Sequence, residues 1–308
     1  MRKWRSSAAA LAVMLCVETP VAAKDSPKPA AASMPPAMAA IEKSLHPQIG
    51  DVRIPEARAV MHLGDRYYFL PAAEARRVLV DAWHNPPESA DNVLGMVLAK
   101  DTTIFDNVWG AVITYEDTGH VDDADARNQD YGTVLKGMQQ GTEEQNAERK
   151  QAGYPAMHLV GWAQPPAYDA SSHSLIWARE LSVEGDAGNG LNYDVRLLGR
   201  TGVLSLNMLA SMQDIGNVRS AAQSFGRSVS FEPGAGYTDF DASTDKDAGY
   251  GLAGLVAGGV AIGVAKKVGL LAIILKFGKV ILLGLAAFGA AAWGAVRKMF
   301  GRKDEEVI

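Results

Sequence analysis

The densest polar segment of the sequence runs from residue 237 to residue 247 and reads YTDFDASTDKD. Oxygen-bearing side chains alternate along it, as in a calcium-binding loop, at Asp239, Asp241, Ser243 and Asp245. The EF-hand pattern fails twice, because Thr244 stands where glycine is required and Tyr250 where the bidentate glutamate belongs. We therefore predict that Thr244 and Asp247 form a capping box for a following helix, with a cation site as the alternative.

Aromatic and proline residues gather between residues 161 and 169, which read GWAQPPAYD. They form a predicted turn, and Trp177 lies on the strand that follows. Aromatic side chains at this density are typical of a core, so core packing is the first interpretation and a ligand groove the second.

Familiar catalytic patterns do not occur in the sequence. The six histidines form no H-E-x-x-H or H-x-H arrangement, the only cysteine is Cys16, and there is no G-x-S-x-G, P-loop or strand-led G-x-G-x-x-G motif. The acidic run Asp122, Asp123 and Asp125 is typical of a solvated helix start. We predict neither a metal site nor a cofactor.

Charge is unevenly distributed along the 308 residues. Residues 24–250 carry a net charge of −12, whereas residues 1–23 carry +2 and residues 251–308 carry +5. Phosphate backbones would be repelled by so acidic a central region, which argues against nucleic acid as a partner.

The N-terminal 23 residues have the pattern of a signal peptide. Arg2, Lys3 and Arg5 precede an apolar run over residues 6–17, and small residues end at Ala23, the expected cleavage point. An uncleaved anchor is the alternative; lipidation of Cys16 is disfavoured by the bulky leucine before it. Residues 24–40 are rich in proline and alanine and predict an extended linker.

The C-terminal region, residues 248–300, predicts one or two membrane helices before a charged tail at 301–308. Residues 280–296 carry no charge and precede Arg297 and Lys298, as in a spanning helix with a basic stop signal. A helix over residues 250–265 has small-residue spacing suited to close helix packing, at Gly254, Gly258, Gly259 and Gly263. It is either a first span of a hairpin with helix 270–296 or an interfacial, self-associating helix.

Between residues 41 and 247, strand-like and helix-like segments alternate. Strands are predicted at 67–70, 93–99, 108–115, 157–162, 174–181, 192–198 and 203–208, and helices after Pro71, over 122–152 with a fresh start at Thr142, and over 214–226. A short turn at 199–202 predicts a hairpin. Alternation along the strand 192–198 places Asn192, Asp194 and Arg196 on one face, and the spacing in helix 214–226 predicts an apolar side formed by Ile215, Val218, Ala222 and Phe225. The expected fold is therefore one α+β domain with a mainly antiparallel sheet.

An ordered set of short motifs resembles a family of bacterial membrane-anchored proteins known only as a domain of unknown function. The motifs are Gly161-Trp162, Pro165-Pro166, Tyr168-Asp169, Trp177-Ala178, Asn192-Tyr193, Arg196, Leu198-Gly199-Arg200, Gly202-Val203-Leu204, Tyr237-x-Asp239-Phe240, Thr244-Asp245-Lys246 and Tyr250-Gly251. The resemblance implies an exported domain with a C-terminal membrane anchor, and it implies no activity.

We expect a non-enzymatic protein of the bacterial inner membrane, with its domain in the periplasm, that acts through protein partners or self-association. The candidate binding surface comprises Trp162, Tyr168, Asp169, Asn192, Asp194, Arg196, Arg200, Asp239, Asp245 and Lys246. The alternative is an envelope hydrolase or solute-binding domain with a cleft near Tyr168, Asp169, Asp194, Arg196 and Arg200.

Overall fold

The computed structural model describes residues 36–258, apart from residues 84, 86, 107–108 and 128. The expected signal peptide, the linker up to residue 35 and the membrane segment from residue 259 onward lie outside the described residues. No helix within the described ranges is both long and apolar enough to cross a bilayer.

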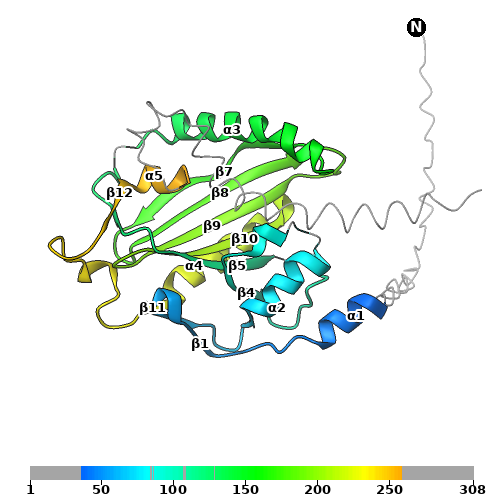
Figure 1. Ribbon diagram of the computed structural model, residues 1–308, viewed down its shortest axis with the longest axis horizontal. Helices are drawn as coiled ribbons and strands as arrows, with labels where there is room; N and C mark the ends of the chain where they lie inside the picture. Colours follow the sequence, from blue (N-terminus) through cyan, green and yellow to red (C-terminus); the bar gives the residue numbers. More distant parts are fainter. Residues whose placement is uncertain (1–35, 84, 86, 107–108, 128, 259–308) are drawn as a thin grey trace, which may run out of the picture. The chain divides into compact units, whose positions relative to one another are not determined.

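Seven antiparallel strands form the main sheet, in the order β3-β4-β5-β10-β9-β8-β7 (Figure 1). They are β3 (Tyr67–Pro71), β4 (Val93–Ala99), β5 (Gly110–Glu116), β7 (Met157–Asp169), β8 (Ser174–Val183), β9 (Gly190–Leu198) and β10 (Val203–Ser211). Two meanders, β3 to β5 and β7 to β10, meet where β5 pairs with β10, with Val203 opposite Glu116 and Leu209 opposite Gly110. The predicted mixed α+β fold with mainly antiparallel sheet is confirmed.

Smaller elements surround this sheet. A three-stranded antiparallel sheet contains β1 (Asp51–Ile54), β2 (Ala59–His62) and β11 (Val229–Phe231), and a parallel pair contains β6 (His120–Asp122) and β12 (Asp247–Gly251). The helices are α1 (Pro36–Lys43), α2 (Ala72–Arg77), which continues into the short π-helix η2 (Val78–Ala82), α3 (Tyr131–Gln151), α4 (Ile215–Ser228) and α5 (Leu252–Val256). Short 3₁₀ turns are η1 (Pro55–Ala57), η3 (Pro87–Ala90), η4 (Met212–Asp214) and η5 (Tyr237–Asp239).

One face of the main sheet, here called the α4 face, packs against α4 and the three-stranded sheet. Alternate strand residues such as Val195 and Leu206 point into this core, because side chains of a strand alternate between the two faces. Helix α4 contributes Val218 and Phe225, both fully buried. The Phe225 ring lies 4.8 Å from the ring of Tyr67, centre to centre. The predicted apolar side of helix 214–226 is therefore the side that faces the core.

The opposite face, here called the α3 face, has two apolar clusters. Leu175 and Trp177 pack with side chains of α3 and α5, and Met96 and Val112 pack with side chains of α2 and η2. Between the clusters, strands β8, β9 and β10 present polar side chains that are also buried. The sheet thus keeps a polar strip in the middle of an otherwise apolar face.

Two predicted elements differ from the structure in extent. Strand β7 does not turn at residue 161 but continues through Pro165 and Pro166 to Asp169, with shifts of register against β8. The prolines are tolerated because β7 is the edge strand and because its pairing with β8 is irregular between Gln164 and Ala167, the stretch that contains both prolines. Helix α3 runs unbroken from Tyr131 to Gln151, and the side chain of Asp130 caps its start. Thr142 therefore does not begin a new helix; it lies in the middle of α3, where its hydroxyl donates to the carbonyl of Met138, 2.9 Å away.

The region around residue 250 also corrects the prediction. Residues 247–251 form strand β12, so Thr244 and Asp247 do not cap a helix there. Helix α5 begins only at Leu252 and ends at Val256, and Gly258 follows with a left-handed φ of 99°. The predicted helix over 250–265 is thus interrupted within its first ten residues. At the other end of the domain, α1 begins at Pro36, inside the segment predicted to be an extended linker.

Candidate functional site

The polar strip on the α3 face is organised around Asp194, which is fully buried. Its carboxylate accepts hydrogen bonds from the guanidinium of Arg179 at 2.7 Å, from that of Arg196 at 3.0 Å and from the amide of Asn207 at 2.8 Å. Asn192 accepts from Arg179 and from Asn207, both at 2.8 Å. We call these five residues the buried polar cluster.

The sequence pattern positions this cluster directly. Asn192, Asp194 and Arg196 occupy alternate positions of β9 and therefore share a face, as predicted from the sequence. Asp194 lies opposite Trp177 on β8 and opposite Asn207 on β10. Of the residues that bond Asp194, Asn207 is thus the directly opposite one, Arg179 lies one pair along on β8 opposite Asn192, and Arg196 follows two residues later on β9 itself. The buried carboxylate is matched by opposite charges at hydrogen-bonding distance.

Several donors around the cluster remain without a partner in the described part of the chain. They are the indole nitrogen of Trp177, the Nε atoms of Arg179 and Arg196, and the hydroxyl of Ser205. The Arg196 guanidinium lies over the Trp177 ring, 5.3 Å from its centre, and 3.7 Å from a carboxylate oxygen of Glu116. The one carboxylate of the cluster, that of Asp194, is thus engaged by two guanidinium groups and an amide.

A stack of four rings lies where β6, β12 and η5 meet. The order is His173, Tyr237, His120 and Phe240, with successive ring centres 4.3, 4.4 and 3.9 Å apart. The Tyr237 hydroxyl donates to the carbonyl of Val121 at 3.1 Å, which ties η5 to β6. Burial is the main cause that raises the pKa of Tyr237, so its phenol stays protonated.

Tyr168, at the end of β7, joins this stack to the acidic run. Its hydroxyl donates to Asp123 at 2.6 Å and lies 3.0 Å from the Nδ1 atom of His173. Burial, followed by the hydrogen bond to Asp123, raises the pKa of Tyr168, so the phenol is not an anionic nucleophile or base at neutral pH. Tyr168 and Asp123 therefore act as a brace between β7 and the segment after β6.

Arg200 and Asp245 form a two-point ion pair between the β9–β10 turn and the polar segment 237–247. The Nε–Oδ2 and Nη2–Oδ1 distances are 2.7 and 3.0 Å. This contact lowers the pKa of Asp245 to about 2. Asp245 also accepts the backbone N–H of Asp241 at 2.8 Å, so its oxygens are occupied by donors of its own chain.

The remaining predicted residues lie apart from these centres. Asp169 accepts from Ser171 within the β7–β8 turn, and Asp239 accepts from the backbone of Gly236. The backbone carbonyl of Lys246 accepts from His120 in the β6–β12 pair. Trp162 lies on the α3 face and donates to the carbonyl of Tyr131 at 3.2 Å. The ten residues thus divide between the α3 face and the loops at one end of the sheet.

The five residues of the alternative cleft do not share one set of contacts. Asp194 and Arg196 touch each other, Tyr168 pairs with Asp123, and Arg200 pairs with Asp245. No group of three or more histidine, cysteine, aspartate or glutamate side chains suited to a metal ion occurs among residues the structure describes.

The glycines predicted to pack membrane helices are only partly described. Gly254 is buried inside α5, whose residues Leu252, Leu255 and Val256 belong to the apolar cluster with α3 and β8, and Gly258 follows the end of that helix. Gly259 and Gly263 lie outside the described residues. Gly254 therefore packs within its own domain.

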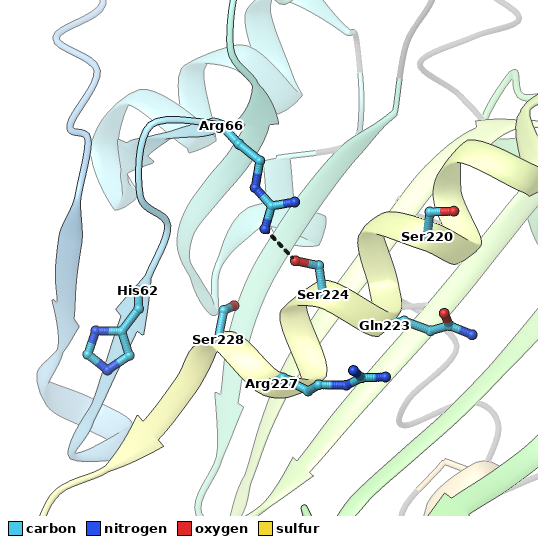
Figure 2. A pocket seen from close by; sticks show the side chains of 7 residues that line it. All are labelled: His62, Arg66, Ser220, Gln223, Ser224, Arg227 and Ser228. Atoms are coloured by element: carbon cyan, nitrogen blue, oxygen red, sulfur yellow. Dashed lines mark hydrogen bonds between the residues drawn. The ribbon is translucent and has the colours of Figure 1, made fainter.

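A surface hollow of about 530 Å³ lies beside α4 (Figure 2). Its lining comes from α4, from the end of β2 and from the turn before β3, and consists of His62, Arg66, Ser220, Gln223, Ser224, Arg227 and Ser228. We call it the α4 hollow. The sequence interpretation missed all seven residues, although the polar side of helix 214–226 was a signal for part of the set.

Contacts within the α4 hollow join the two chain segments. Arg66 donates to the hydroxyl of Ser224 at 2.9 Å, a contact visible in Figure 2. The His62 ring is fixed from both sides, 2.9 Å from Asp51 through Nδ1 and 2.9 Å from Ser230 through Nε2. Arg227 and Gln223 make no side-chain hydrogen bond or ion pair with the described residues. Cationic and amide donors are thus held beside one another at the surface.

Comparison with known proteins identifies a family and little more. No curated protein matches the chain. Among solved structures, the solution structure of cyanobacterial PsbP (CyanoP) from Synechocystis sp. PCC 6803 is similar at 8% identity and a TM-score of 0.34, over 59% of this chain and 91% of that one. A likeness of this size carries no argument about function. A family model described as "Protein of unknown function (DUF2167)" matches residues 46–289. Because this match covers well over half of the sequence, the chain belongs to the DUF2167 family.

Proposed function

We propose that this chain is a membrane-anchored protein of the bacterial cell envelope whose folded domain acts by binding another envelope component. The charged start and apolar run of residues 1–23 support export, and the uncharged segment 280–296 with its basic flank supports anchoring. The absence of cysteine after residue 23 is compatible with an oxidising compartment, because such a domain can neither form nor lose a disulfide.

The α4 hollow is the structural feature that best supports a binding role. It collects side chains with free hydrogen-bonding capacity from two distant chain segments, on a helix whose other side is locked into the core by Val218 and Phe225. Binding sites are typically concave, with a few polar groups held on a rigid scaffold. The hollow agrees with this description in being concave and in lying on a fixed helix, and its lining is polar throughout.

Internal pairing weighs against the hydrolase alternative. Acid–base catalysis needs a carboxylate, imidazole or phenol that is free to exchange a proton with a substrate. Asp194 is instead buried under two guanidinium groups and an amide, and the Tyr168 phenol donates to Asp123. These groups hold strands and loops together.

Photo-crosslinking in intact cells tests the binding role. A photo-reactive amino acid replaces Gln223, which is exposed in the hollow, and in a matched variant it replaces Asp186, which is exposed in the β8–β9 loop. We expect an adduct from position 223 that is missing from position 186. The mass of the adduct separates a protein partner, a second copy of the chain and a lipid. No adduct at 223, or the same adducts at both positions, would contradict the proposal.

A further inference from the structure

We propose that the α4 hollow binds an oxyanion of the phosphate type through its arginines, Arg66 and Arg227, either as free phosphate or as the phosphate of a larger molecule. This inference names the ligand chemistry of the binding site proposed above and rests on that proposal. Its own test uses purified protein and is independent of where the protein resides.

Charge is the first argument. The seven lining residues include two arginines and a histidine, and none of them is acidic. Residues 24–250 carry a net charge of −12, so a carboxylate-free lining with two guanidinium groups departs from the average of the domain. Asp51 is not part of the lining, and its carboxylate is paired with the His62 ring at 2.9 Å. The lining therefore favours an anion.

Free donor capacity is the second argument. Arg66 uses one terminal nitrogen to bond Ser224, which fixes the side chain against α4 and leaves other N–H groups of its fork. Arg227 has neither a hydrogen bond nor an ion pair with any residue that the structure describes. A guanidinium presents parallel N–H groups that match two oxygens of a phosphate or carboxylate.

The number of donors separates phosphate from carboxylate. Besides the two guanidinium groups, the hollow offers the amide of Gln223 and hydroxyl groups of serine. The Ser220 and Ser228 hydroxyls already donate to backbone carbonyls of α4, whereas the Ser224 hydroxyl accepts from Arg66 and keeps its own O–H to donate. A carboxylate has two oxygens, whereas a phosphate group presents three or more and can therefore accept from more of these donors.

Pre-organisation is the third argument. The α4 wall is fixed by the burial of Phe225 and Ala222, and the β2 wall by His62, whose two ring nitrogens are already engaged by Asp51 and Ser230. His62 therefore acts as a wall rather than as a ligand, and the two arginines supply the binding. Walls that are already fixed before a ligand arrives lower the ordering cost of binding.

The volume of the α4 hollow indicates a ligand that is larger than a bare phosphate ion. A volume of about 530 Å³ lies within the usual range for small-molecule sites and exceeds what one inorganic phosphate fills. Glycerol phosphate, the anionic part of a common lipid headgroup, and inorganic phosphate are thus the two probes that distinguish the sources.

Calorimetric titration of the full-length chain in non-ionic detergent provides the test. The titrants are inorganic phosphate and glycerol phosphate at constant ionic strength, with chloride as the reference anion. We expect saturable binding of a phosphate titrant, weakened about tenfold in Arg227→Gln and in Arg66→Gln, the loss expected for one charge-assisted hydrogen bond. Tighter binding of glycerol phosphate indicates a headgroup, and equal or tighter binding of inorganic phosphate indicates the free ion; either supports the proposal.

Arg219→Gln is the matched control, because Arg219 lies on the same helix but outside the hollow and bonds Gln164. It removes the same charge and should leave phosphate binding within about twofold, as distant surface charges contribute little. Thermal unfolding verifies that each variant is folded. No saturable phosphate binding by the folded wild type, or equal weakening in Arg219→Gln and Arg227→Gln, would overturn the proposal. Either result leaves the crosslinking test of the binding role unaffected.

Discussion

The carboxylate of Asp125 accepts the backbone N–H of Leu252, with an Oδ1–N distance of 3.0 Å across 127 residues of sequence. Its other oxygen lies 3.4 Å from the N–H of Ala253. Asp125 therefore caps α5 from a loop elsewhere in the chain, at the positive end of the helix dipole. Because α5 is the last described element before residue 259, this contact fixes where the chain leaves the domain.

Asp125→Ala should loosen α5 without unfolding the domain. The loss of a side-chain cap costs about 1 kcal/mol, and two N–H groups lose their acceptor. Hydrogen exchange of the amides of residues 252–256 should speed up by about fivefold, which is that energy expressed as a rate ratio. Asp65→Ala, in the exposed turn before β3, is the control and should leave these amides unchanged. Unchanged exchange in Asp125→Ala would show that the cap does not hold the helix.

Asp194→Asn should strongly destabilise the domain. The substitution keeps the shape of the side chain but leaves Arg179 and Arg196 without a buried counter-charge. Breaking a buried ion pair by removing one partner costs about 3–5 kcal/mol. Urea unfolding of the detergent-solubilised chain measures the loss, with Asp186→Asn in an exposed loop as the control. A loss below about 1 kcal/mol would mean that the buried polar cluster is not structural.

Phe225→Ala should be comparably costly, because Phe225 is fully buried between α4 and the sheet. Its ring contacts those of Tyr67 and Trp109, with centres 4.8 and 5.7 Å away. Truncating a buried phenylalanine costs about 3–5 kcal/mol through lost transfer energy and the cavity that remains. The same unfolding experiment on Gln223→Ala, on the exposed side of the helix, should change stability by less than about 0.5 kcal/mol. Similar losses for both would contradict the assigned orientation of α4.

Acidification should weaken the ring stack through His120. Burial, the main cause, lowers the pKa of His120 below its ordinary value of 6.5, so the unfolded chain binds a proton more readily than the folded chain. The contribution of His120 to stability is therefore complete above about pH 6.5 and falls as the pH drops toward its folded pKa.

Thermal unfolding between pH 7.5 and pH 5 measures this effect. His120→Phe keeps a stacking ring between Tyr237 and Phe240 but cannot bind a proton. The melting temperature of the wild type should fall more steeply over this interval than that of the variant. Equal slopes would show that His120 does not couple protonation to folding.

Local periodicity was sufficient to predict much of the fold. The alternation of polar and apolar residues in β9 correctly placed Asn192, Asp194 and Arg196 on one face, because a strand exposes alternate residues to opposite sides. The spacing of Val218, Ala222 and Phe225 likewise identified the buried side of α4. These signals are contained within single elements.

The incorrect predictions depended on contacts between distant segments. Pro165 and Pro166 indicate a turn unless the strand is known to lie at a sheet edge, which only the pairing of all seven strands decides. The helix start near residue 250 moved to Leu252 because its cap comes from Asp125. Likewise, the α4 hollow arises where Arg66 meets Ser224, 158 residues away in the chain. The spacing of residues along the sequence does not show which distant segments come into contact in the folded chain.

The central claim is that a folded domain is exported and held at the membrane by its C-terminal region. Cell fractionation is the most direct test of this claim. The full chain is compared with a form that stops after Gly258, where the described domain ends. The account predicts that the full chain is found in the inner-membrane fraction with Lys24 as its first residue, and that the shortened form is released with the periplasmic contents. A full chain recovered from the cytosol with Met1 still attached would contradict it.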